Sequence, residues 1–377
     1  MNSLRLTACL LLSLSAFAAE PVKWTPEAAN LWYSKQPWMV GVNYVPASAI
    51  NQIEMWNADT FDPVIIDTEL GWAQAIGMNT VRVFLHEIPW LKDPGGCAKR
   101  IGAFLRIADK HKIRVLFVLF NSRWSPFPEP GIQQDARSGV HNSAWVQDPG
   151  APALMDEEHW DRHLLYVEDV IHEFLADKRV VAWDLWSEPD NRNEGSYSAA
   201  DPKNKAELAQ RILPRLFKFA RAAMPSQPLT SSLWQGDWSS PDKLSAVEKI
   251  QLEESDIVSF HNYDKPADFE KRLQWLQQYH RPVFCTEFLA RDRDSTFQGI
   301  LPIAKKYNAA AFSWGLVAGK TQTYLPLDSW QHPYTDRQPA VWHQDIFRDN
   351  GTPYSQEEID FIRQITGRGG PAKAKGK

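Results

Sequence analysis

The sequence predicts an α/β protein with a single (β/α)8 TIM barrel, and two features of the chain support this fold class. Short apolar runs alternate with longer amphipathic segments, and several runs are almost continuously apolar, as strands of a parallel sheet are when both faces are covered. No shift in composition marks a second domain, so eight strand–helix units are expected to form one barrel. A doubly wound sheet is the alternative architecture.

The apolar runs define the expected strands, and the amphipathic segments between them define the expected helices. The strands are residues 39–45, 79–85, 113–120, 180–187, 228–234, 256–261, 282–288 and 309–315. The helical segments include residues 64–76, 99–111, 155–176, 204–223, 268–279 and 296–307. Asp62 and Pro63 provide start signals for the first of these helices, and Gly77 provides its stop signal.

Two of the connections are unusually long. Residues 121–154 are rich in Pro, Gly, Trp and Asp, and residues 318–355 follow the last expected strand. Loops of this length in a compact domain are usually functional or disordered. Both follow the carboxyl end of a strand, so we expect long βα loops at the C-terminal face, where barrels build their sites.

The two ends of the chain differ from the barrel domain, expected at residues 19–366. Residues 1–18 combine Arg5, an apolar core and a small-residue cleavage site, which is typical of a secretory signal peptide. The protein is therefore expected to be exported, either periplasmic or secreted, and not to be held by a membrane after cleavage. Residues 367–377 form a basic, Gly-rich tail that is expected to be disordered.

Composition and motifs exclude several classes of function. The net charge of -5 lacks the basic excess that nucleic-acid binding requires, so no nucleic-acid partner is expected. No Gly-rich phosphate loop follows a strand, and neither a cofactor nor a metal is expected. His159 and His163 have a spacing that also suits a solvated helix face, which we prefer to a metal site. The oligomeric state is not indicated.

The candidate chemistry lies at the ends of the expected strands. Glu188 follows the fourth strand and Glu287 ends the seventh, and these strands face each other across the mouth of an eight-stranded barrel. Two opposed carboxyl groups suit retaining glycoside hydrolysis, in which one protonates the leaving oxygen and the other attacks the anomeric carbon. Arg82, inside the otherwise apolar second strand, is a cation that would keep one of them ionised.

These motifs resemble those of a known group of enzymes over most of the chain. WDLWSEPDN at residues 183–191 is similar to the WDLxNEP signature of clan A glycoside hydrolases, which include the family 5 cellulases and mannanases. The resemblance implies that Glu188 is the acid/base and Glu287 the nucleophile. It also implies that Arg82 lies beside the nucleophile.

The resemblance assigns further residues to the sugar site. His261 would lie near the acid/base and Tyr263 near the nucleophile, while Trp314 would form the floor of the site. Asn43 and Tyr44 resemble the segment that ends the first strand of many relatives. The chain departs from the signature at Ser187, where the clan usually has an Asn whose amide binds the sugar's 2-hydroxyl.

The serine leads to a hypothesis about the substrate. The sugar's 2-hydroxyl would be bound through water or by another residue such as Asn121 or Asn262. Alternatively, the substrate would carry a different configuration or substituent at C2. Reduced activity is the other reading of this departure. The 17 tryptophans suit stacking on sugar rings, although most are expected to pack in the core. The candidates for sugar subsites in the loops are Trp124, Trp145, Trp234, Trp238 and Trp330.

Taken together, the residues predict a retaining glycoside hydrolase that cleaves β-linked oligo- or polysaccharide of the β-glucan or β-mannan type. A carbohydrate-binding protein without hydrolytic activity is an alternative, although such a protein has no use for two opposed Glu. A transglycosylase would use the same residues. The sugar, its linkage and the choice between chain ends and chain interiors stay open, and the last depends on whether the two long loops close one end of the cleft.

Overall fold

Eight parallel strands form the centre of the molecule, and the computed structural model describes residues 22–368 around them. The strands are β1 (Val40–Asn43), β2 (Thr80–Phe84), β3 (Arg114–Asn121), β4 (Val180–Ser187), β5 (Leu229–Ser232), β6 (Val258–His261), β7 (Val283–Phe288) and β8 (Ala310–Trp314). The expected signal peptide, residues 1–18, and all but the first two residues of the expected tail lie outside the described residues.

The strand order confirms the predicted barrel. The strands are hydrogen-bonded in the order β5-β4-β3-β2-β1-β8-β7-β6, so each lies beside its neighbour in sequence and β1 pairs with β8. Between β5 and β6 the ring is closed by a parallel bridge from Leu233 to Phe260, with the Leu233 amide donating to the Ser259 carbonyl at 3.0 Å. This ring excludes the doubly wound alternative.

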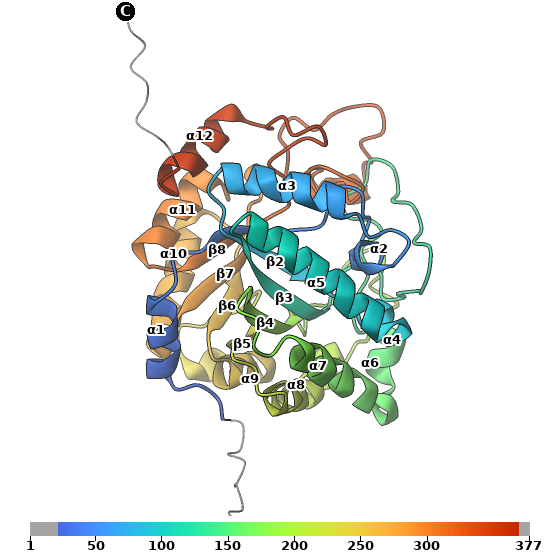
Figure 1. The fold of residues 1–377 in the computed structure, drawn as a ribbon, viewed down its shortest axis with the longest axis vertical. Coiled ribbons are helices and arrows are strands. Elements are labelled where there is room, and N and C mark those ends of the chain that lie inside the picture. Colours follow the sequence, from blue (N-terminus) through green and yellow to red (C-terminus); the bar gives the residue numbers. More distant parts are fainter. Residues whose placement is uncertain (1–21, 369–377) are drawn as a thin grey trace, which may run out of the picture.

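Helices surround the barrel (Figure 1). Those that follow strands are α3 (Pro63–Ala75), α4 (Glu87–Lys92), α5 (Pro94–Lys110), α7 (Asp161–Glu173), α8 (Lys205–Ala222), α9 (Ala246–Glu254), α10 (Pro266–Leu276), α11 (Phe297–Lys306) and α12 (Gln356–Ile365). Three shorter or flanking helices are α1 (Pro26–Ser34), α2 (Gln52–Trp56) and α6 (Ala151–Met155). As predicted, Asp62 caps α3, accepting hydrogen bonds from the amides of Val64 and Ile65.

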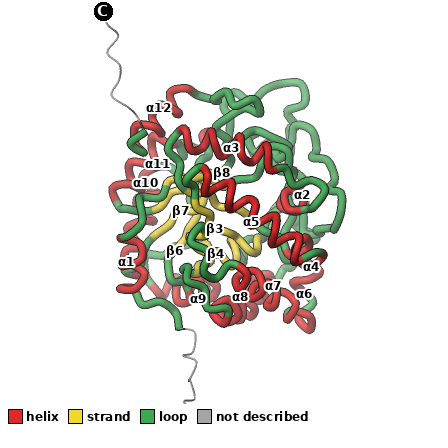
Figure 2. The backbone as a smooth tube through the Cα atoms, in the orientation of Figure 1, coloured by secondary structure: helices red, strands yellow, loops and turns green. Residues whose placement is uncertain are grey.

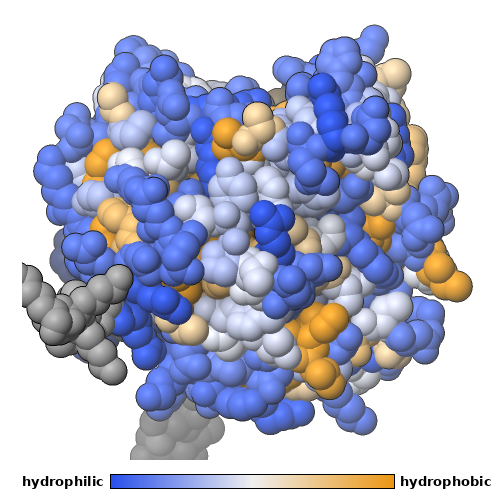
Figure 3. Space-filling model, turned by 90° about the horizontal axis from the view of Figure 1, so that it is seen from above, coloured by the Kyte–Doolittle hydropathy of each residue, from blue (hydrophilic) through white to orange (hydrophobic). Residues whose placement is uncertain are grey.

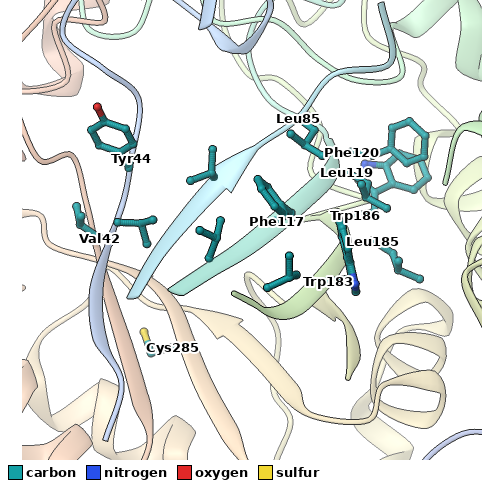
Figure 4. Close-up of a cluster of buried hydrophobic side chains, with 14 of the residues drawn as sticks. Val42, Tyr44, Leu85, Phe117, Leu119, Phe120, Trp183, Leu185, Trp186 and Cys285 are labelled. Atoms are coloured by element: carbon teal, nitrogen blue, oxygen red, sulfur yellow. The ribbon is translucent and has the colours of Figure 1, made fainter. Parts of the chain in front are cut away.

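Side chains along each strand alternate between the helical layer and the barrel interior. Figure 4 shows part of the buried apolar cluster, in which Phe117 of β3 and Trp183 of β4 stack with ring centroids 5.6 Å apart. The opposite faces of β2, β3 and β8 supply Phe84, Leu116 and Phe312 to a second, smaller cluster. Interior positions nearer the carboxyl ends carry polar groups instead, and these form the site described below.

The two long loops lie on the same side of the barrel. In Figures 1 and 2 the loop after β3 and the loop after β8 run together on the side away from α1. The first contains α6, and the second contains a short 3-10 helix at Leu327–Trp330. Both positions agree with the predicted C-terminal face.

The face of the molecule seen in Figure 3 is mainly polar. In Figure 3 hydrophobic residues are scattered as small, separate groups among hydrophilic ones. None of the helices within residues 22–368 has the length and apolar character that crossing a membrane requires.

Candidate active site

A cavity of about 270 Å³ opens at the carboxyl ends of the strands. Glu188 and Glu287 lie in its wall, with residues from both long loops around them. The other lining residues are Phe84, Asn121, Ser122, Arg123, Trp124, His141, Asn142, Trp145, Ser187, Asn191, Trp234, Tyr263, Arg293, Trp314, Leu327, His343 and Gln344. The cavity therefore combines two carboxyl groups with aromatic walls.

The two carboxyl groups approach each other through His261. The Nδ1 atom of His261 lies 2.5 Å from Glu188 Oε1 and 3.4 Å from Glu287 Oε2. An oxygen of each carboxyl group and a ring nitrogen of the histidine all lie within 4.8 Å of one another. Strands β4 and β7 thus bring together two groups separated by 99 positions in sequence.

Arg82 holds the nucleophile candidate from beneath. Its side chain is fully buried, and Nη1 donates to Glu287 Oε1 and to Asn43 Oδ1, both at 2.8 Å. Its Nη2 donates to Asp184 Oδ2 at 2.7 Å and to Ser187 Oγ at 2.9 Å. A buried guanidinium needs such partners, and the fork shape lets one side chain fix several acceptors at once.

Asp184 is a residue of this buried network that the sequence reasoning missed. It lies inside β4, fully buried, and accepts hydrogen bonds from Arg82 and from the Ser232 hydroxyl. The signal was present, because a charge in the middle of the apolar run VVAWDLWS requires a buried partner. Ser259 donates to Ser232, so the polar network continues to β6.

The surroundings act on the two carboxyl groups in opposite directions. Burial raises the pKa of Glu287 above its usual value, although His261, Arg82 and a hydrogen bond from Tyr263 favour its ionised form. Burial also acts to raise the pKa of Glu188, but the charge and hydrogen bond of His261 together with the amide of Asn191 hold it below its usual value. Tyr263 stays a proton donor because burial and Glu287 raise its pKa well above the usual value.

The predicted residues separate into a lining set and a supporting set. Ser187, Asn121, Trp124, Trp234, Tyr263 and Trp314 line the cavity. Asn43, Arg82 and His261 lie behind it, where the amide of Asn43 donates to the carbonyls of Thr286 and Ser313. These three residues therefore position the carboxyl groups from behind the cavity wall.

Tyr44 does not contribute to this cavity. It is fully buried on the helix-facing side of the barrel (Figure 4), where its hydroxyl donates to Glu69 Oε2 at 2.8 Å and its ring packs on Phe104. The prediction of a sugar contact is wrong because Asn43 and Tyr44 are neighbours in sequence and their side chains point to opposite faces.

The expected loop tryptophans also behave differently from one another. Trp238 is fully buried and donates to Glu248 Oε1 at 2.9 Å, so it is a packing residue and not a sugar platform. Trp145 is nearly buried but lines the cavity, in contact with Phe84 and Trp314. Trp330 stacks on Trp124 with ring centroids 5.1 Å apart and lies outside the cavity.

The two asparagines considered as substitutes for the missing amide, Asn121 and Asn262, form hydrogen bonds with other residues of the protein. Asn121 accepts from Gln52 at 2.8 Å and donates to the Val146 carbonyl at 3.0 Å. Asn262 donates to Asp264 and does not line the cavity. Asn191, which sequence reasoning did not select, donates to Glu188 Oε2 at 2.5 Å. Its place three residues after Glu188 was the available signal.

His159, in the 3-10 helix Glu157–His159, and His163, in α7, do not point toward a common site. His163 is fully buried against Glu87 Oε2 at 2.5 Å, whereas His159 is exposed and paired with Asp156. The interpretation of a solvated helix face is therefore wrong for His163. Within residues 22–368, one group of residues has metal-ligand geometry, namely Glu188, His261 and Glu287, whose atoms already bind one another.

Comparisons with known proteins give structural neighbours and no sequence relatives. No protein-family profile matches the chain, and no curated protein is similar to it. The exo-β-1,4-mannosidase Op5Man5 from Opitutaceae bacterium strain TAV5 is similar over 88% of this chain and 59% of its own, with 17% identity and a TM-score of 0.57. This chain thus spans less than two thirds of that protein's length.

Two further solved structures agree. A GH5_18 protein from Bifidobacterium longum, in complex with Manβ1-4GlcNAc, has 14% identity and a TM-score of 0.57 over 88% of this chain and 78% of its own. The endo-β-1,4-mannanase from Thermotoga petrophila has 14% identity and a TM-score of 0.56 over 89% and 77%. The chain therefore shares its fold with these three proteins.

Proposed function

We propose that this protein is a retaining β-glycoside hydrolase that acts on β-linked oligo- or polysaccharide of the mannan type. The observation that carries the proposal is the distance of at most 4.8 Å between an oxygen of Glu188 and an oxygen of Glu287 inside one cavity. Retaining enzymes hold the two carboxyl groups roughly 5–5.5 Å apart, whereas inverting enzymes leave about 6.5–9.5 Å for a water molecule.

Glu287 is the nucleophile in this proposal. Its ionised form is favoured by two hydrogen bonds to Arg82 and Tyr263, at 2.8 and 2.7 Å. Arg82 donates to Oε1 of Glu287 and Tyr263 donates to Oε2. Together these two charge-assisted hydrogen bonds fix the orientation of the carboxylate toward the cavity. Attack on the anomeric carbon forms a glycosyl ester on Glu287 and releases the leaving group.

Glu188 donates the proton to the leaving oxygen. The charge and hydrogen bond of His261, whose Nδ1 atom lies 2.5 Å from Glu188 Oε1, hold the pKa of Glu188 below its usual value although burial acts to raise it. In its protonated form Glu188 lies where it can pass a proton to the leaving oxygen. In the second step Glu188 accepts a proton from water, which then cleaves the glycosyl ester.

Aromatic side chains supply the sugar platform. Trp314 lies at the end of β8 and contacts Phe84 and Trp145, so three rings meet at the base of the cavity. Flat aromatic surface suits the C–H faces of a pyranose ring. The mannose specificity is supported by the structural neighbours, three of which are described as acting on or binding β-mannosides.

The test is a substrate screen with matched variants. Purified protein, Glu287→Ala and Glu188→Ala are assayed on β-mannan, β-glucan and aryl β-glycosides, with Glu357→Ala on the exposed face of α12 as control. We expect activity in the protein and the control, loss in Glu287→Ala, and a β-anomer as the first product by NMR. An α-anomer would contradict the retaining mechanism.

Two other results separate the alternatives. Sugar binding without turnover in all four proteins would favour the carbohydrate-binding protein. Longer products in the presence of added sugar acceptors would favour the transglycosylase.

A further inference from the structure

We propose, on the basis of the function proposed above, that the enzyme acts from the non-reducing chain end. The inference concerns the wall formed by the loop at residues 122–150 and the loop at residues 315–355, here called the loop wall. If the loop wall closes the cavity where the sugar under attack is bound, then a chain can enter only by its end.

The two loops are joined by direct hydrogen bonds. The backbone N–H of Asn142 donates to the Thr321 carbonyl, and the backbone N–H of Tyr334 donates to the Gly139 carbonyl, both at 2.8 Å. The Gly139 amide donates to Gln322 Oε1 at 2.8 Å, and the Leu325 carbonyl lies 2.7 Å from His141 Nδ1. The stack of Trp124 on Trp330, with 10° between the rings, joins them again nearer the rim.

The loop wall is also fixed to the barrel. Gln52, in α2 after β1, donates to the Val146 carbonyl at 2.7 Å, so the first loop is held from below. Arg291, after β7, forms an ion pair with Glu358 at 2.8 Å and donates to the carbonyls of Gln344 and Asp345. These contacts attach both loops of the loop wall to the barrel.

The chemistry identifies which end of the cleft the loop wall closes. The leaving group must lie beside the acid, Glu188, next to Asn191 and Trp234. On this side the connection from β6 to α10 is only residues 262–265, although residues 188–204 after β4 also border it, and Arg123 of the loop wall donates to Asn191 Oδ1 there at 3.1 Å. The attacked sugar lies over Glu287 toward Trp314, and there the loop wall supplies Trp145.

The inner face of the loop wall carries polar groups that are not used within the protein. Asn142 and Gln344 line the cavity, and each side chain is at least nine-tenths buried. Among the described residues, the amide oxygen of neither side chain has a hydrogen-bond partner. Buried amides without partners are costly, and sugar hydroxyls are donors and acceptors that fit them. Because both amide oxygens are buried away from the cavity, we assign the two side chains to the hydroxyls of the terminal sugar through rotation of each amide on binding.

The size of the cavity agrees with this assignment. About 270 Å³ lies just below the range of roughly 300–1,000 Å³ that is usual for ligand pockets. Such a space suits a short chain end and not a long segment of polysaccharide.

The experiment compares two versions of one oligosaccharide. Both are β-1,4-linked manno-oligosaccharides with a nitrophenyl group at the reducing end, and one carries a 4,6-acetal cap on its non-reducing sugar. We expect cleavage of the uncapped version, with the first product one sugar shorter, and roughly 10–200-fold slower cleavage of the capped version. Equal rates would overturn the chain-end inference while leaving the glycosidase function intact.

Failure of the proposed function gives a different result, because neither version would then be cleaved. In that case calorimetric titration of Glu287→Ala with the two versions still tests the loop wall. Tighter binding of the uncapped version supports a closed end, and equal binding overturns it.

Variants test the two amides separately. Asn142→Ala and Gln344→Ala are each expected to lower kcat/KM on the uncapped version by roughly 3–10-fold, the effect of one neutral hydrogen bond. Gln356→Ala, at an exposed position of α12, is the matched control for loss of an amide. Values equal to the control, in variants with unchanged Tm, would overturn the assignment of these residues.

Discussion

The hydroxyl of Ser187 accepts a hydrogen bond from Arg82 Nη2 at 2.9 Å, and Ser187 lines the cavity directly before Glu188. Because the guanidinium can only donate, the serine proton is left for another acceptor. Ser187 thus links the charge beneath the nucleophile to the space where the sugar's 2-position would lie. The serine belongs to the site's hydrogen-bond network and is not a simple loss of the usual amide.

Replacement of Ser187 tests this role. We predict that Ser187→Asn does not raise turnover on plain β-glucosides or β-mannosides, because the larger amide competes with Glu287 and Asp184 for Arg82. Ser187→Ala is expected to lower kcat/KM by roughly 3–10-fold through loss of one hydrogen bond. Steady-state kinetics on aryl glycosides measure both. An increase in Ser187→Asn would contradict the idea that C2 is recognised differently here.

The hydroxyl of Tyr263 favours the ionised form of Glu287, with an O–O distance of 2.7 Å. Tyr263→Phe removes this donor, while burial continues to raise the pKa of the carboxyl group. Since activity requires ionised Glu287, the acidic limb of the kcat/KM profile is predicted to move to higher pH. A full profile from stopped assays on an aryl glycoside measures this limb.

Tyr307→Phe is the matched control for this prediction. Tyr307, directly after α11, also donates to a glutamate, Glu270 of α10, at 3.0 Å, and neither residue lines the cavity. Its profile should match that of the unchanged protein. An unmoved acidic limb in Tyr263→Phe would remove Tyr263 from the support of the nucleophile.

The barrel and the carboxyl pair could be predicted because both depend on local pattern. Apolar runs gave the eight strands with ends that agree closely with those observed, for example 180–187 for β4. Strand-end residues such as Glu188 and Glu287 then follow from the topology alone, since parallel strands present their carboxyl ends to one mouth.

The errors have two physical causes. Tyr44 was assigned to the site although Asn43, its neighbour, faces inward in register with Arg82, and alternation places the two on opposite faces. The loop wall could not be predicted, because contacts such as Asn142 to Thr321 join residues far apart in sequence and depend on loop conformation. Neither residue type nor spacing distinguishes Trp145 in the cavity from Trp238 in the core.

Arg82 gives a prediction that combines stability with activity. The guanidinium of Arg82 bonds acceptors from Asn43 to Ser187, whereas the single ammonium group of Arg82→Lys cannot reach them all. Either the fully buried Asp184 or the largely buried Glu287 then loses its partner. We expect a loss of about 3–5 kcal/mol in the free energy of unfolding. Arg179→Lys, in a part-exposed pair with Asp177, is the control and should cost at most about 1 kcal/mol. Urea unfolding measures both.

Lys205 of α8 gives the last prediction, because it is a buried cation that holds two loops beside the cavity. Its Nζ atom donates to the Ser122 carbonyl at 2.7 Å and to Gln147 and Asp201, both at 3.1 Å. Burial lowers the pKa of Lys205 to about 8, although Asp201 acts to raise it. The folded protein therefore releases this proton at a lower pH than the unfolded chain, whose lysine has the usual value of 10.5.

The sign of the pH dependence follows from this difference. Below pH 8 both states carry the proton, so the full cost of burying the charge is present. Between pH 8 and 10.5 the unfolded state binds more protons, and stability from this group rises with pH, by on the order of 3 kcal/mol over the whole window. Lys205→Met should lack this rise, whereas Lys110→Met, at an exposed ion pair with Asp67, should retain it. Urea unfolding across this window measures the difference. If the free energy of unfolding changed with pH in the same way in the protein and in Lys205→Met, Lys205 would keep its proton throughout. Asp201 would then favour the charged form more strongly than burial opposes it.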